Sequence, residues 1–153
     1  MRIANGRTLI RLFRVECRCR NDEIREVFIL SRYLFIAMGA ALGANARYLV
    51  GVWAAEWFGP DFPYGTLLVN VTGSFILGFL VAVTTGRIQI SPELRLMLAV
   101  GFLGSYTTFS SFAVESTLLW RDMGGWLSLR NVLLNNGVGL IYALLGAYAA
   151  RFV

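Results

Sequence analysis

The stretch Gly101–Glu115, which reads GFLGSYTTFSSFAVE, decides how the rest of this chain is interpreted. It lies inside a strongly apolar segment, yet it carries serine, threonine and tyrosine hydroxyls and an acid. Gly104 followed by Ser-Tyr-Thr-Thr is poor helix material, because glycine is flexible and Ser and Thr compete for backbone hydrogen bonds. Non-helical backbone at membrane depth is tolerated only where it is buried in protein or lines a watery cavity. The stretch therefore predicts a helix broken in mid-membrane and a functional site at the break.

The composition places the whole chain in the bilayer. Hydrophobic residues make up 57% of it and charged residues 15%, against roughly 45–50% and 25% in an average soluble domain. Its 153 residues leave room for about four spans of ~20 residues each. We therefore predict an all-α integral membrane protein with four transmembrane helices, at about Tyr33–Phe58, Gly65–Gly86, Glu93–Trp120 and Asn131–Ala150.

The charge of the chain excludes several classes of function. The net charge is +5, every basic residue is an arginine, and histidine is absent. Histidine-based triads, histidine–zinc sites and imidazole proton relays are therefore excluded. In so apolar a chain the basic balance favours anionic lipid head groups as partners over nucleic acid. Outside the N-terminal segment, the arginines near the span ends give only a weak positive-inside bias.

Residues 1–32 differ from the rest and hold eight of the fourteen arginines. We divide the chain into an N-terminal extension, residues 1–32, expected to be disordered, and a four-helix membrane domain, residues 33–153. Cys17 and Cys19 form a lone C-x-C pair, which lacks the further ligands that zinc needs. An inert tail is the preferred interpretation. Metal binding and a misassigned start, with the natural one nearer Val27, are the alternatives.

Two polar residues in the first two spans need an explanation. Arg47 shares a helix face with Gly39 and Gly43, which form a small-residue seam for close packing. An arginine this far into a span must snorkel, pair with an acid or face a vestibule. Asn70, in the otherwise uncharged second span, either bonds another helix or faces an aqueous pathway.

The third span combines hydroxyls with aromatic rings. Thr108, Ser111 and Glu115 form one polar stripe at helical spacing, and Phe109 and Phe112 stand beside it. Phenylalanine pairs at this spacing are usually plain packing. Interleaved with hydroxyls, however, ring edges carry partial positive charge and hydroxyls donate hydrogen bonds, and together they can replace the water shell of a small anion.

The fourth span has a face of polar and small residues. Asn131, Asn135, Gly139 and Gly146 fall roughly on one side of the predicted helix. We expect this face to contact the second span, the third span or another subunit.

At these motifs, from Tyr33 to the C-terminus, the chain resembles the CrcB/Fluc family of fluoride channels. Three segments carry the resemblance: GANARY at residues 43–48, YGTLLVN at 64–70 with Gly73, and GFLGSYTTFSSF at 101–112 with Glu115. The last is the most specific. The resemblance implies an antiparallel, dual-topology homodimer with two fluoride pores and a central sodium ion. It also implies a channel, and no enzyme, that exports fluoride from the cytoplasm across the inner or plasma membrane and so lowers fluoride toxicity.

The resemblance also implies roles for individual residues. The sodium ion would be held by the backbone carbonyls of Gly104 and Thr107. Two departures from the family pattern are Gly104-Ser105, where Gly-Gly is usual, and Gly139, where a small hydroxyl is frequent. The fluoride path would consist of the ring edges of Phe109 and Phe112, the amide of Asn70, the hydroxyls of Thr108, Ser110 and Ser111, Glu115 further along, and Arg47 at the vestibule.

Elementary physics agrees with a donor-lined path. Stripping an anion of its water costs on the order of tens of kcal/mol in an apolar medium. Glu115 is an awkward neighbour, since a carboxylate repels an anion unless it is protonated, paired with an arginine or aimed away.

Three rival functions are weaker. A drug/proton antiporter needs a membrane-embedded acid, typically in the first span, which offers only Glu56 at its end. A membrane enzyme would need a serine or acid mechanism, and no general base is near the serines. A purely structural subunit would not need Phe and Ser interleaved beside a mid-membrane asparagine.

Overall fold

The structure, a computed structural model, describes residues 6–86 and 88–153, and the side chains from Phe28 onward except that of residue 87. The chain divides into two compact units, Met1–Leu34 and Phe35–Val153. For residues 6–27 only a helical backbone is described. The predictions for the side chains of this segment, including a metal site at Cys17 and Cys19, lie outside the described residues. The division at residue 32 and the disorder of the extension stay predictions.

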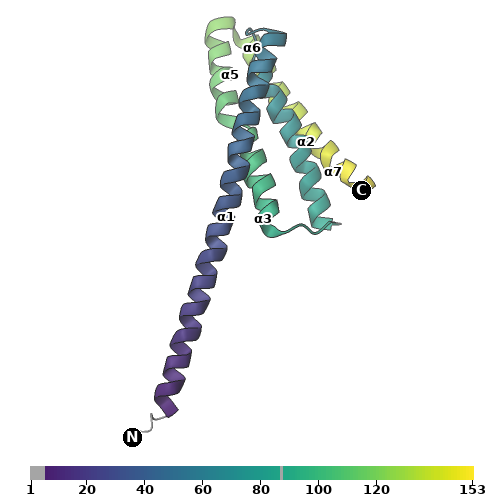
Figure 1. The fold of residues 1–153 in the computed structure, drawn as a ribbon. Helices are drawn as coiled ribbons and strands as arrows, with labels where there is room; N and C mark the ends of the chain where they lie inside the picture. Colours follow the sequence, from purple (N-terminus) through teal and green to yellow (C-terminus); the bar gives the residue numbers. More distant parts are fainter. Residues whose placement is uncertain (1–5, 87) are drawn as a thin grey trace. The chain divides into compact units, whose positions relative to one another are not determined.

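The described residues are helical throughout, with no strand among them, and four stretches are long and apolar enough to cross a membrane. The predicted all-α class with four membrane-spanning helices is confirmed. The four stretches are Phe28–Phe58, Tyr64–Gly86, Pro92–Met123 and Gly125–Phe152. The elements, shown in Figure 1, are α1 (Gly6–Phe58), α2 (Tyr64–Gly86), α3 (Pro92–Arg95), η1 (Leu96–Leu103), α4 (Gly104–Tyr106), α5 (Phe109–Met123), α6 (Gly125–Leu133), η2 (Leu134–Val138), α7 (Gly139–Ala149) and η3 (Ala150–Phe152).

The fourth span begins earlier than the sequence predicts. Helix α6 starts at Gly125, six residues before the predicted start at Asn131. The reason is a tight turn at Gly124, whose φ of 93° lies in the left-handed region that glycine tolerates best. The chain therefore reverses within one residue of the end of α5, and α5 and α6 pack against each other.

Glycines let the spans of the second unit approach one another closely. In Figure 1 helices α2 and α7 lie side by side, and they form the most extensive helix pair. A Cβ on Gly146 would collide with the carbonyl oxygen of Phe75, and one on Gly78 with that of Ala143. The small-residue seam predicted at Gly39 is confirmed as well, because the backbone of η1 lies directly against that glycine.

Buried polar side chains gather where α2, α5, α6 and η2 meet. Asn131 is fully buried, with an exposed fraction of 0%, and the other four are almost as inaccessible. The predicted face of Asn131, Asn135, Gly139 and Gly146 is buried at all four positions. Its contacts run to α2 and α5, two of the partners that were expected. The five buried polar residues are Thr108, Ser116, Ser128, Asn131 and Asn135.

Candidate functional site

A hollow of about 250 Å³ opens where α5 begins. Its walls come from α2, from the two residues that precede α5, from the first turn of α5 and from η2. One side is polar and the other is apolar. The lining residues are Asn70, Gly73, Ser74, Leu77, Thr107, Thr108, Phe109, Phe112, Asn135 and Asn136.

The backbone leaves helical geometry at Thr107 and Thr108, which have φ, ψ of −86°, 158° and −152°, 120°. Gly104, where the sequence suggested the weakest helix, is itself helical, with φ −64° and ψ −29°. The non-helical backbone therefore lies three residues later than its glycine. The physical reason is the pairing of the Thr108 peptide with Asn70.

Asn70 binds Thr108 as a second strand would. Its Oδ1 accepts from the Thr108 N–H at 2.8 Å, and its Nδ2 donates to the Thr108 carbonyl at 3.1 Å. Both backbone groups of a non-helical residue are satisfied in this way, as burial requires. Gly73 lies one turn further along α2, where any Cβ would collide with the side chain of Thr107.

The same pairing changes the partners of two carbonyl groups. In an uninterrupted helix Thr108 N–H would donate to Gly104 and Ser111 N–H to Thr107. Here Thr108 N–H donates to Asn70, and Ser111 N–H caps α5 by donating to Thr108 Oγ1 at 3.2 Å. The carbonyls of Gly104 and Thr107 thus lose their usual helical donors.

Three hydroxyls cluster at the start of α5. Thr108 Oγ1 donates to Ser111 Oγ at 3.1 Å and lies 3.3 Å from Ser110 Oγ. Thr108 is buried, Ser111 is half-buried and Ser110 is exposed. The cluster therefore offers hydroxyl donors over a range of depths beside the hollow.

Phe109 and Phe112 form an edge-to-face pair, with ring centroids 5.6 Å apart and planes at 61°. Both line the hollow. Phe112 is 7% exposed, whereas Phe109 is 76% exposed within one chain. The two rings thus meet the hollow from different environments.

Glu115 lies outside this hollow. Its Oε1 accepts from the Thr66 hydroxyl at 2.7 Å, and its Oε2 is buried with no hydrogen-bond partner among the described residues. It borders a second hollow of about 290 Å³ together with Asp61 and Asp122. Arg47 is half-buried on α1, and the structure gives it no ion pair within the described part of the chain.

The structure adds Ser116 and Ser128, which sequence reasoning did not single out. The Ser116 hydroxyl donates to the Phe112 carbonyl at 2.8 Å and accepts from Asn131 Nδ2 at 2.9 Å. Ser128 Oγ donates to the Ser116 carbonyl at 2.7 Å. The signal that was available is spacing, since Ser128 and Asn131 are three residues apart and share a helix face.

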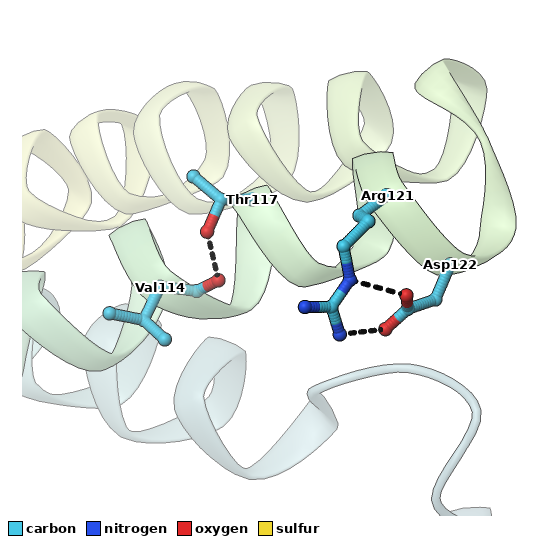
Figure 2. A network of polar contacts seen from close by, with 4 residues as sticks. All are labelled: Val114, Thr117, Arg121 and Asp122. Atoms are coloured by element: carbon cyan, nitrogen blue, oxygen red, sulfur yellow. Dashed lines mark hydrogen bonds and ion pairs between the residues drawn. The ribbon is translucent and has the colours of Figure 1, made fainter.

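The opposite face of α5 is ordinary membrane-protein surface. Thr117 Oγ1 donates to the Val114 carbonyl at 2.7 Å, and Arg121 pairs with its neighbour Asp122 through bonds of 2.6 and 2.8 Å (Figure 2). The side chains of this ion pair are 71% and 53% exposed. None of these groups contacts the hollow.

Comparison with known proteins follows from this geometry. Residues 34–147 match the family model described as "CrcB-like protein, Camphor Resistance (CrcB)". A protein of Legionella pneumophila strain Paris, named "Fluoride-specific ion channel FluC", is 45% identical over 126 residues, which cover 82% of this chain and 93% of the relative. Proteins of the same name from Koribacter versatilis and Sulfurihydrogenibium sp. are 46% identical over 121 residues (78% and 94% covered) and 44% identical over 124 (81% and 100%).

Proposed function

We propose, because this multi-pass membrane protein belongs to the CrcB-like family, that it is a fluoride-specific ion channel of the cell's inner or plasma membrane. Its listed relatives, at about 45% identity, bear the name of such a channel, which is not an enzyme. The observation that carries the proposal is the hollow at the start of α5, which combines donors with aromatic ring edges. Export of fluoride down its gradient from the cytoplasm is the expected direction.

Fluoride passes, in this proposal, along the wall formed by Asn70, the hydroxyl cluster and the phenylalanine pair. Both N–H bonds of Asn70 are engaged, one by the Thr108 carbonyl and one by Asn135 Oδ1 at 2.9 Å. The bond to Asn135 is the one that an anion in the hollow would compete for, since it joins two side chains. The edges of Phe109 and Phe112 would offer the partial positive charge on the other side.

A second copy of the chain completes the pore. Phe109 is 76% exposed and Gly104 is exposed in a single chain, although both belong to the stretch that carries the function. An antiparallel partner in a dual-topology homodimer would cover them. It would also give each fluoride path a wall from each subunit.

Sodium would bind where the two breaks meet. The carbonyls of Gly104 and Thr107 lack their usual helical donors, and backbone oxygens without donors suit a hard cation that takes oxygen ligands. Two carbonyls from each subunit would supply four oxygens. The ion would contribute positive charge and hold the breaks together, with no charged side chain required.

Arg47 and Glu115 lie at the ends of the proposed path. Arg47 would raise the local concentration of anions at the vestibule. Glu115 is held by Thr66, and that bond directs one carboxylate oxygen away from the phenylalanine pair. This arrangement supports a carboxyl group that shapes the path without facing the ion.

Fluoride efflux from liposomes tests the proposal. Purified protein reconstituted into fluoride-loaded vesicles should release fluoride rapidly once a potassium ionophore dissipates the voltage, as read with a fluoride electrode. Chloride-loaded vesicles are the matched control and should release little. Equal release of both anions, no release, or proton flux driven by an added cationic drug would each contradict a fluoride channel.

A further inference from the structure

A directed chain of hydrogen bonds runs from the wall of the hollow into the protein. The backbone N–H of Thr108 can only donate, so the Asn70 atom that faces it is the oxygen, Oδ1. The Asn70 Nδ2 group then faces two acceptors, the Thr108 carbonyl and Asn135 Oδ1. The orientation of the Asn70 amide is therefore set by the backbone, without the usual ambiguity between oxygen and nitrogen.

The same orientation passes through two further amides. With its oxygen on Asn70, Asn135 directs Nδ2 at the backbone oxygen and the Oδ1 of Asn131, at 3.1 and 2.9 Å. Asn131 in turn donates to Ser116 Oγ, whose own hydrogen goes to the Phe112 carbonyl. The chain Asn70–Asn135–Asn131–Ser116, which we call the amide relay, thus starts and ends on α5.

Asn131 is the member of the amide relay that touches no part of the hollow. Its exposed fraction is 0%, while Asn70 and Asn135 both line the hollow. It accepts both N–H bonds of Asn135, and so it leaves the oxygen of Asn135 facing Asn70. Without that acceptor Asn135 would hold unpaired donors in an apolar interior, which is costly, and its amide would have to turn.

We propose that Asn131 is a positioning residue for the ion path: acting through Asn135, it holds the Asn70 amide on the Thr108 peptide. The relay returns to α5 at Phe112, so the same contacts keep both the polar and the aromatic wall of the hollow in place. The inference rests on the proposed function, because its consequence is read in the fluoride current.

Single-channel recording in planar bilayers separates this role from simple stabilisation. The unitary current belongs to each conducting protein, so a loss of folded protein reduces the number of current steps and leaves their size unchanged. Asn131→Leu keeps the approximate volume and removes both side-chain partners. We expect its unitary fluoride current to fall about tenfold, the rate equivalent of one lost hydrogen bond at the upper end of the usual range.

A double mutant tests whether Asn131 acts through Asn135. If it does, Asn131→Leu should have no further effect in a protein that already carries Asn135→Leu, since the link to Asn70 is already cut. The double mutant and Asn135→Leu should then show the same unitary current. Independent, multiplying reductions would overturn the proposal, as would a current of wild-type size in Asn131→Leu.

A milder pair of variants keeps the test decisive if Asn131→Leu does not assemble. Ser116→Ala removes the acceptor of the Asn131 amide. Thr117→Val removes the neighbouring hydroxyl, which bonds only its own helix (Figure 2). Ser116→Ala should lower the unitary current and Thr117→Val should not, and equal currents would overturn the proposal. A wild-type protein that carries no fluoride current would instead refute the channel function itself.

Discussion

Helix α2 meets its neighbours at two junctions that are built in opposite ways. Against α7 it forms a seam of bare backbone, where Gly78 and Gly146 each leave no room for a methyl group. Against α5 and η2 it forms a polar junction, where Asn70 bonds the Thr108 peptide and Asn135. The seam sets how closely helices approach, and the junction sets where particular donors point.

The two junctions contribute different amounts to stability. Apolar burial does not drive helices together in lipid, so close packing at small residues carries much of the association. Side-chain hydrogen bonds between membrane helices average only about 0.6 kcal/mol each. We therefore expect changes at the seam to unfold the protein and changes at the polar junction to alter conduction in a protein that still folds.

The largest effect is expected at the seam. Gly146→Val places a branched side chain against the Phe75 carbonyl, a backbone atom that cannot move aside without shifting α2. The free energy of unfolding in a detergent titration should fall by about 3 kcal/mol. Gly137→Val is the matched control, because a Cβ there meets nothing within 4 Å. Equal stability of the two variants would show that the seam does not limit the fold.

The next effect is expected on the aromatic wall. Phe112→Ile keeps an apolar side chain but removes the ring edge, so fluoride efflux should fall about a hundredfold, the rate equivalent of about 2.7 kcal/mol. Phe109→Ile should reduce efflux as well, although its ring is 76% exposed in one chain and contributes little to the stability of the monomer. Both variants should keep their dimeric state in size-exclusion chromatography.

Wild-type efflux in both phenylalanine variants would return the pair to ordinary packing. Loss of efflux in Phe112→Ile alone would also be informative. It would mean that the buried ring of the pair faces the ion and that the exposed ring of Phe109 only covers the interface.

A smaller effect is expected at Glu115. Thr66→Val is nearly isosteric and removes the hydroxyl that donates to Glu115 Oε1 at 2.7 Å. Because both carboxylate oxygens would then lack a partner among the described residues, unfolding should become easier by about 1 kcal/mol. Efflux should fall by about fivefold, the rate equivalent of that energy. Thr84→Val, which loses a hydroxyl bonded only within its own helix, should change neither quantity.

The sequence predicts the seam and the polar junction to different degrees. Hydropathy and glycine spacing are local properties, so the four spans and the small-residue faces could be predicted. The position of the non-helical backbone could not, because Asn70, 38 residues before Thr108, decides it through a tertiary contact. Ser116 was missed for the same reason, since a serine beside Glu115 has no special pattern until Asn131 packs against it.

The smallest effect is expected on the outer face of α5, where Arg121 and Asp122 form a close ion pair of 2.6 Å. By distance it is among the shortest polar contacts of the protein, yet both side chains are mostly exposed. Exposed pairs gain little because water and salt screen the attraction and because two flexible side chains must be ordered. Arg121→Gln and Asp122→Asn should therefore match the wild type in both unfolding and efflux, at low and at high salt. A clear loss of efflux in either variant at low salt, reversed by high salt, would show that charge on this face acts on the ion path over a distance. The division between a polar junction that conducts and a surface that does not would then have to be redrawn.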